Sequence, residues 1–435
     1  MPVPLADESN IAVLQAPVSA VLSAQAMAID RPFLKPVGID LSAPLTPNQI
    51  AIIAVLTNPD LTALRARAGV SDAQVFAAGL LPDPTFSAGI DHVVAGPPVV
   101  DNLVTALAFN LNALRTLGVT RERARAANRQ VRLDLAWVEW QTSGSARLQA
   151  VRILHQRDVL AIAIASETSA QSLLSRYLRA SGRGDISADR VQAARLSAID
   201  ATANRRTAEI SLTAAEYELR RLLGVPPEFP LALAPAAMPE AAPSATALFN
   251  LAIKERTDLQ ALRAGYAAQE ASVHKAVLDQ FPTLDLTLTG TRDTGRNTLL
   301  GPAIGLTLPL WNRNRGGIAI ERATRDALRS EYDARLFQAR AEIAAAVAGL
   351  TLARRQRALL LSGLPEIEKF TRATRRAATR GDLAVATAET AEQTLRDRRL
   401  LLIQSEQAIA EQSIALELLV GAPQESWANM GGLKS

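Results

Sequence analysis

The chain has 435 residues; 48% are hydrophobic but only 4% aromatic, and 47 Lys and Arg face 43 Asp and Glu. Few aromatics with many Ala, Leu and Arg are typical of long helices rather than of a compact core. A net charge of +4 forms no polybasic stripe, which argues against a nucleic-acid partner. The absence of cysteine excludes disulfides, thiolate zinc sites and a cysteine nucleophile. No unbroken apolar run reaches the roughly 18 residues of a transmembrane helix.

An internal duplication is the most informative feature of the sequence. Asp60-Leu61 recurs 198 positions later as Asp258-Leu259, and Gly184-Asp185 recurs 197 positions later as Gly381-Asp382. The segment 222–226 recurs in the same way as 419–423. Landmarks at a nearly constant shift indicate two structurally equivalent halves.

The duplication predicts the organisation of the chain. We expect an N-terminal extended segment (1–44), a first repeat (45–224), a Pro-rich linker (225–243), a second repeat (244–423) and a C-terminal tail (424–435). Each repeat is expected to contain a helix, two short strands, a very long helix and a return helix. The fold class is therefore mainly α with a small β portion.

The first repeat begins at Thr46 and Pro47, a helix N-cap followed by a first-turn proline. Its first helix is expected to reach about residue 80, with a kink at Pro59. Period-two alternation then predicts strands at 85–94 and 105–112. A long helix over 116–180 and a return helix over 187–223 complete the repeat.

The second repeat shows the same pattern more clearly. Alternation predicts strands at 283–291 and 303–310, and these are followed by a long helix over 314–380 and a return helix over 384–420. Apolar residues of the long helix recur every three or four positions, as in a coiled coil. Pro365 is expected to kink this helix.

Each predicted strand has one apolar and one polar face. We expect the apolar side chains to face lipid: Phe86, Ile90, Leu107, Phe109, Leu286, Leu288, Leu306 and Leu308. The polar side chains would then line a wet barrel lumen: Asp285, Thr287, Thr289 and Thr307. Four strands cannot close a barrel, so this arrangement needs several chains. The alternative is a small soluble sheet whose apolar face packs on itself or on the helices.

At this point the layout resembles the TolC family of outer-membrane efflux channels, over roughly residues 45–423. The resemblance rests on the paired halves, the Asn58-Pro59-Asp60 helix start, the 81–84 segment Leu-Pro-Asp-Pro before a strand, and the two Gly-containing tips. The sharpest segment, 308–316, is similar to the strand-to-helix junction of the CzcC-like and CusC-like branch, which partners heavy-metal RND pumps.

The resemblance implies a homotrimer in the outer membrane of a Gram-negative bacterium, with a 12-stranded barrel and a periplasmic α-barrel of twelve helices. It also implies a periplasmic adaptor (membrane fusion protein), an inner-membrane RND pump and outer-membrane lipid as partners. Such a channel is a passive exit duct, without enzymatic activity or cofactor, for metal cations or small toxic compounds. In two places where many relatives carry Asp, this chain has Arg190 and Thr387.

The candidate site residues lie at the two tips and at one strand end. The resemblance places adaptor docking at Arg183, Gly184, Asp185, Arg380, Gly381 and Asp382. An acidic constriction would use Asp185, Asp189, Asp382 and Glu389. The alternative is that each tip Gly ends one helix while the following Asp caps the next. Trp311 would anchor the chain at the membrane interface.

Other motifs favour structural roles. His92, on an apolar strand face, is more typical of an interfacial residue than of a metal ligand, so no metal site is predicted. Trp137 and Trp140 are expected to pack between helices. No nucleophile–base pair or phosphate loop indicates an enzyme. The rival hypothesis is a soluble periplasmic or cytosolic coiled-coil scaffold or adaptor.

Overall fold

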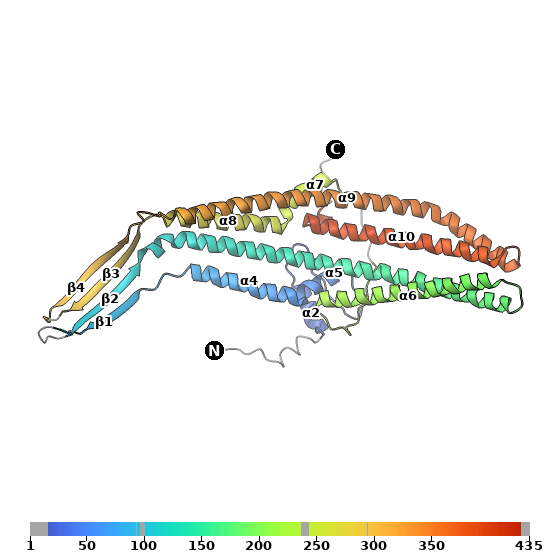
Figure 1. Cartoon of the computed structure of the whole chain (residues 1–435), viewed down its shortest axis with the longest axis horizontal. Helices are drawn as coiled ribbons and strands as arrows, with labels where there is room; N and C mark the ends of the chain where they lie inside the picture. The colour runs from blue at the N-terminus through green and yellow to red at the C-terminus, as the bar shows by residue number, and fades with distance from the viewer. Residues whose placement is uncertain (1–15, 93, 96–100, 236–242, 294, 428–435) are drawn as a thin grey trace. The chain divides into compact units, whose positions relative to one another are not determined.

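The structure is a computed structural model that describes residues 16–92, 94–95, 101–235, 243–293 and 295–427 (Figure 1). The chain forms two compact units. Unit 1 comprises Met1–Thr62, Val138–Glu255 and Ala339–Ser435, and unit 2 comprises Ala63–Trp137 and Arg256–Gln338. The elements are α2 (Ser19–Met27), α3 (Pro47–Thr57), α4 (Pro59–Ala78), β1 (Thr85–Asp91), β2 (Asn102–Asn110), α5 (Leu111–Ser181), α6 (Ala188–Leu223), α7 (Ala245–Glu255), α8 (Thr257–Leu278), β3 (Thr283–Arg292), β4 (Thr298–Thr307), α9 (Arg315–Arg380), α10 (Val385–Val420) and α11 (Gln424–Trp427).

The expected fold class, mainly α with a small β portion, is confirmed by this element order. The series α4-β1-β2-α5-α6 recurs as α8-β3-β4-α9-α10, as the duplication predicts. The N-terminal segment is not wholly extended, because it contains α2, whose Leu22 and Ala26 lie one turn apart and are buried. The first 15 residues, residues 236–242 of the predicted linker and residues 428–435 of the predicted tail lie outside the described residues.

Several predicted boundaries were wrong, because hydrogen-bonded partners rather than alternation end a strand. β1 stops at Asp91, whose partner Asn102 opens β2, and not at residue 94. β2 ends at Asn110 because α5 begins at the next residue, earlier than the expected residue 116. β4 covers Thr298–Thr307 rather than 303–310. Its last residue pairs with Thr283, and the preceding Pro282 has no N–H to extend the ladder.

The first predicted helix is in fact two helices, α3 and α4, separated at Asn58. The ψ angle of Asn58 is 123°, an extended conformation that the residue before a proline favours. Asn58 is buried, accepts a bond from the Leu61 N–H at 3.0 Å and donates one to the Leu222 carbonyl at 2.9 Å. Pro365, by contrast, lies inside α9, which continues through it.

In unit 2, one antiparallel sheet has the strand order β1-β2-β3-β4, so β1 and β4 are its edges. The adjoining helices are joined by polar contacts. Arg132 of α5 pairs with Asp72 of α4 at 2.8 Å, and Arg335 of α9 pairs with Asp258 of α8 at 3.1 Å. Arg115 at the start of α5 donates to the carbonyls of Leu278 and Pro282, which fixes the end of α8 beside β3.

Unit 1 holds two hydrophobic cores. The larger core gathers side chains from α2, α3, α5, α6 and the segment after α6, and the chain also forms a parallel bridge there between Leu45 and Leu233. The smaller core joins α7, α9 and α10, and Trp427 closes it. These cores hold the middle of α5 and of α9 against the C-terminal ends of α6 and α10.

Among the helices that the structure describes, one, α9, contains an 18-residue stretch that is long and apolar enough to cross a membrane. The stretch is not an unbroken apolar run, because it includes charged residues. Core helices of soluble proteins meet the same criterion.

Candidate functional site

The strand pairing separates the sheet into two faces. In an antiparallel ladder, directly opposed residues lie on the same face. Leu107 pairs with Phe86 on one side and with Leu288 on the other, and Leu286 pairs with Phe109 and Ile304. One face therefore carries the apolar residues assigned to the strands: Phe86, Ile90, Leu107, Phe109, Leu286, Leu288 and Leu306. The opposite face carries Asp285, Thr287, Thr289 and Thr307.

The apolar face is open in the single chain. Phe86 and Ile90 are both 69% exposed, and Ile304 is 71% exposed. Soluble proteins seldom leave so many large apolar side chains together in water. No described helix of unit 2 covers this face, although the soluble-sheet alternative would require such a cover.

Leu308 does not belong to this face. It follows the last residue of β4 and lies in the segment that leads to α9. Trp311 lies in the same segment with 91% of its surface exposed. Shortly after it, Arg313 and Asn314 have φ angles of 45° and 48°, a left-handed turn that bulky side chains seldom adopt. Asn314 donates to the Ala276 carbonyl at 2.9 Å and so ties the start of α9 to α8.

The two tips of unit 1 have the same local structure. Gly184 and Gly381 have φ angles of 82° and 84°, which is the left-handed conformation that glycine adopts without strain. Each following Asp N–H bonds back to a carbonyl five residues earlier, as in a Schellman motif. Arg183 pairs with Asp185 at 2.9 Å, and Arg380 pairs with Asp382 at 2.9 Å. At both tips, therefore, an Arg and an Asp neutralise each other beside a glycine whose backbone has open space around it.

The expectation that each tip Asp caps the following helix was wrong. The N-cap residues of α6 and α10 are Ser187 and Ala384. Asp189 instead lies in the first turn of α6, where the Ser187 hydroxyl and backbone N–H groups hold the pKa of its carboxyl below the ordinary value. Asp189 therefore interacts with its own helix start.

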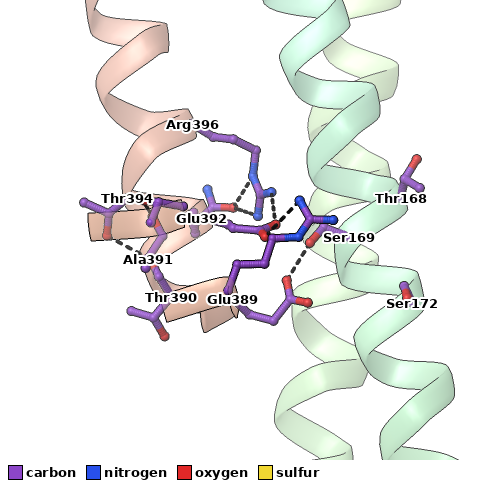
Figure 2. A network of polar contacts seen from close by, with 12 residues as sticks. Thr168, Ser169, Ser172, Glu389, Thr390, Ala391, Glu392, Thr394 and Arg396 are labelled. Atoms are coloured by element: carbon purple, nitrogen blue, oxygen red, sulfur yellow. Dashed lines mark hydrogen bonds and ion pairs between the residues drawn. The ribbon is translucent and has the colours of Figure 1, made fainter. Parts of the chain in front are cut away.

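Glu389 lies in an interhelical network and not beside the tip carboxylates. Figure 2 shows its side chain extending from α10 toward α5, where the Ser169 hydroxyl donates to it at 2.6 Å. Arg176 of α5 also pairs with Glu389 at 3.3 Å. On the same helix, Glu392 contacts Arg396 at 3.7 Å. The candidate acidic residues thus have different settings: two in tip pairs, one at a helix start and one between helices.

Three other predicted residues make structural contacts. The Nδ1 atom of His92 lies 2.6 Å from the Asp101 carboxylate, near the ends of β1 and β2. Trp140 packs edge-on against Phe33, with ring centroids 5.0 Å apart. The Trp137 ring lies under the Arg256 guanidinium at 4.9 Å. Within the described residues, no group of three His, Asp or Glu side chains is arranged to hold a metal ion.

A buried charged cluster in unit 2 was missed by the sequence analysis. Arg256 is 2% exposed and donates to both carboxylate oxygens of Asp258, from Nε at 3.0 Å and from Nη2 at 2.7 Å. Asp134 of α5 lies close to Asp258, and burial together with that negative charge raises its pKa. The repeat gave no signal, because the position that matches Arg256 is the uncharged Asn58. This cluster joins α5, α8 and α9.

Comparison with known proteins finds one matching family and solved structures with a similar fold. Residues 248–422 match the family described as outer membrane efflux protein, and this match covers the second repeat. No curated protein matches the chain in sequence. CusC has 17% identity and a TM-score of 0.71, covering 91% of this chain and 99% of that one.

Two further channels show the same fold. The Campylobacter jejuni CmeC outer membrane channel has 13% identity and a TM-score of 0.72, covering 86% of this chain and 85% of that one. The outer membrane protein VceC of Vibrio cholerae has 17% identity and a TM-score of 0.71, covering 86% of this chain and 96% of that one. The chain therefore has the fold of the outer-membrane channels. The family match agrees with a transport conduit and not with an enzyme.

Proposed function

We propose that this protein is the outer-membrane channel of a tripartite efflux system, a passive exit duct built from three copies of the chain. The observation that carries the proposal is the four-stranded sheet with one exposed apolar face and two free edges, β1 and β4. A sheet edge cannot lie in lipid because its backbone groups would stay unbonded. Three such sheets joined edge to edge give twelve strands in a closed barrel.

The two sheet faces support this assignment. The strands are 7 to 10 residues long, close to the ~9–11 residues of a tilted outer-membrane strand. Leu286 and Leu288 would face lipid, while Asp285, Thr287 and Thr289 would line the water-filled lumen. Trp311, exposed where β4 ends, would lie at the lipid–water interface.

The tips are the proposed docking site for a periplasmic adaptor, which would connect the channel to an inner-membrane RND pump. Both glycines leave open space around the backbone, since an added Cβ would meet no atom within 4 Å. A partner helix end can therefore approach the chain closely. The 308–316 segment, which resembles the junction of the branch that partners heavy-metal pumps, supports a pump of that type, with metal cations or small toxic compounds as cargo.

The test is expression in a Gram-negative strain that lacks its own channel of this kind, together with a cognate pump and adaptor. The protein should fractionate with the outer membrane, need detergent for extraction, and restore export only when all three components are present. Recovery of a folded, detergent-independent protein in the soluble periplasmic or cytosolic fraction would support the scaffold alternative instead.

A further inference from the structure

The positive charge of the chain is concentrated at the two tips of unit 1. Ten residues on either side of Gly184 and of Gly381 give the segments 174–194 and 371–391, which together hold eight arginines and four acidic residues. Their net charge of +4 equals that of the whole chain. The remaining 39 Lys and Arg are balanced by the remaining 39 Asp and Glu. The excess charge therefore lies within a tenth of the sequence.

The acidic side chains of the tips are already engaged. Each tip Asp is paired with the arginine two residues before it, at 2.9 Å in both tips. Glu389 is bound by Ser169 and Arg176. Asp189 is held mainly by the Ser187 hydroxyl and by backbone N–H groups at the start of α6. These contacts leave a surplus of arginine side chains.

Three arginines make up this surplus. Arg179 of α5, Arg190 of α6 and Arg376 of α9 form no ion pair within 4 Å with any residue that the structure describes. All three are exposed. Arg179 and Arg376 are counterparts in the two repeats, 197 positions apart, so both halves of the chain carry an unpaired arginine shortly before the tip glycine.

The helix dipole accounts for only part of this arrangement. Arg179 lies in the last turn of α5, and Arg376 lies four residues before the end of α9, where a positive charge is favourable. Arg190, by contrast, is the third residue of α6, and a positive charge is unfavourable at a helix N-terminus. Arg190 therefore does not stabilise its own helix, which favours a role toward an anion from outside the chain.

The two tips lie side by side at one end of unit 1 (Figure 1), because Arg176 near the first tip reaches Glu389 near the second. Charges within about a Debye length, ~8 Å at physiological salt, act together. A narrow opening lined by one sign of charge concentrates ions of the opposite sign. Three copies of the chain around one opening would triple the excess charge there.

We infer that the tips form an anion-attracting mouth and that the cargo entering there consists of small anionic compounds with a carboxylate or another oxyanionic group. The inference rests on the function proposed above, which puts the tips at the end where cargo enters. Guanidinium groups stay charged at physiological pH and can bind an oxyanion through two parallel hydrogen bonds. The same field would repel free metal cations. The inference therefore narrows the two cargo classes named above to anionic small compounds.

Planar-bilayer recordings of the purified protein measure this preference. Under a KCl gradient, the reversal potential of the unmodified channel should show that chloride is more permeant than potassium. The preference should weaken when the salt is raised from ~0.1 M to ~1 M, because the Debye length falls from about 10 Å to about 3 Å. The triple variant Arg179→Gln, Arg190→Gln, Arg376→Gln should lose the chloride preference or reverse it.

A matched variant removes three other exposed arginines: Arg206→Gln, Arg322→Gln, Arg398→Gln. Along the return helices, Arg398 lies 17 residues from Gly381, roughly 25 Å of helix, and Arg206 lies still farther from Gly184. Arg322 belongs to unit 2. This variant loses the same amount of charge but should keep the chloride preference.

The charge at one position can also be changed in the assembled channel, because the chain has no cysteine and an introduced thiol is unique. Arg190→Cys should lose part of the chloride preference. A positively charged methanethiosulfonate reagent should restore it, a negatively charged reagent should lower it further, and a neutral reagent should leave it unchanged. This comparison does not depend on the folding of the triple variant.

Reconstituted liposomes test the class of cargo. Carboxyfluorescein, an anionic dye, should leave the liposomes faster than a cationic rhodamine of similar size. The difference should disappear in the triple tip variant and persist in the matched variant.

A cation preference of the unmodified channel, or the same selectivity in the tip variant as in the unmodified protein, would overturn the inference. If the tip variant keeps its selectivity but no longer binds the adaptor, the arginines serve an acidic surface of that partner and the inference is also wrong. A cation-selective channel that restores export with pump and adaptor would keep the proposed function and refute only the anionic mouth. An anion-selective channel that never restores export would contradict the proposed function instead.

Discussion

The Ser169 hydroxyl donates a 2.6 Å hydrogen bond to the Glu389 carboxylate and so joins α5 to α10 near the tip of unit 1. Only 17% of the Glu389 side chain is exposed, and Arg176 provides a second partner. A carboxylate with two partners on a neighbouring helix holds that helix in place. This geometry gives Glu389 an interhelical role and not a place among the tip carboxylates.

Replacement of Glu389 by Ala should therefore lower the stability of the assembled protein by about 1–2 kcal/mol, because two bonds to a largely buried carboxylate are lost. Glu389→Gln keeps a hydrogen-bonding group for Ser169 and should cost less. Thermal unfolding in detergent measures both variants. A change in the cation selectivity of the channel without loss of stability would show that Glu389 lines the conducting path after all.

The sheet provides a second prediction, which concerns its two faces. Leu286→Arg should impair membrane assembly by roughly 2–4 kcal/mol if the site lies near the bilayer midplane, because a charge would enter lipid. The adjacent Thr287→Arg should assemble normally and change single-channel conductance, because its side chain would enter the lumen. Heat-modified gel mobility and planar-bilayer recordings measure the two effects. If the two variants exchange their effects, the assignment of faces is reversed.

The sequence predicted the element order and the two sheet faces well, because both depend on local periodicity. Alternation places Leu286 and Thr287 on opposite faces whatever the strand ends are. The strand ends depend on the partner strand: β4 stops at Thr307 because Pro282 ends the opposing ladder. The break at Asn58 depends on the Leu222 carbonyl, which lies far away in the sequence.

The tip residues show the limit of sequence reasoning about sites. The Gly-Asp pattern correctly predicted the turns, but a glycine turn permits several uses of the following Asp. In the structure each tip Asp pairs with the Arg two residues before it, and the first residue of the next helix comes later. Glu389 was grouped with these residues by its distance along the chain. Its partners on α5 are more than 200 residues away and leave no local signal.

Substitutions of Gly381 distinguish a role in adaptor docking from a purely structural role in the turn. Its φ of 84° is strained for valine, whereas asparagine tolerates this conformation. Gly381→Val should disturb the turn and abolish export. Gly381→Asn should keep the turn and the trimer, yet still reduce export if a partner needs the open space beside the backbone. Export assays and quantification of trimers compare the two variants. Full export by the Gly381→Asn variant would show that the glycine serves only the turn.

The Arg380–Asp382 pair predicts how charge acts at the tip. Both side chains are at least 60% exposed, so the pair should contribute little to stability, and Asp382→Ala should leave thermal unfolding almost unchanged. Arg380→Ala should free the carboxylate and increase cation selectivity or block by multivalent cations in planar bilayers. Asp382→Ala should act in the opposite direction. Equal and unchanged selectivity in both variants would place the pair away from the conducting path.

The contact between Arg152 and Glu411 predicts a dependence of stability on pH. Burial raises the pKa of Glu411, but hydrogen bonds from Arg152 at 2.8 Å and Gln407 at 2.9 Å, together with the charges of Arg152 and His155, outweigh burial and hold the pKa below the ordinary value. A carboxyl whose pKa is lower in the folded state stabilises the fold above its unfolded pKa, about 4.5, and loses this contribution as the pH falls through the folded value.

Glu411→Gln should therefore lower stability near neutral pH by no more than about 1 kcal/mol, since Arg152 is partly exposed and solvent screens the pair. The variant should also lose part of the decline in stability that acid causes in the unmodified protein. Thermal unfolding of the detergent-solubilised protein between about pH 7 and pH 3 gives both quantities. Glu425→Gln, which alters an exposed pair with Lys35, is the matched control and should retain the acid-dependent decline. If the Glu411 variant and the control follow the same pH curve, the α5–α10 contact does not depend on this carboxylate.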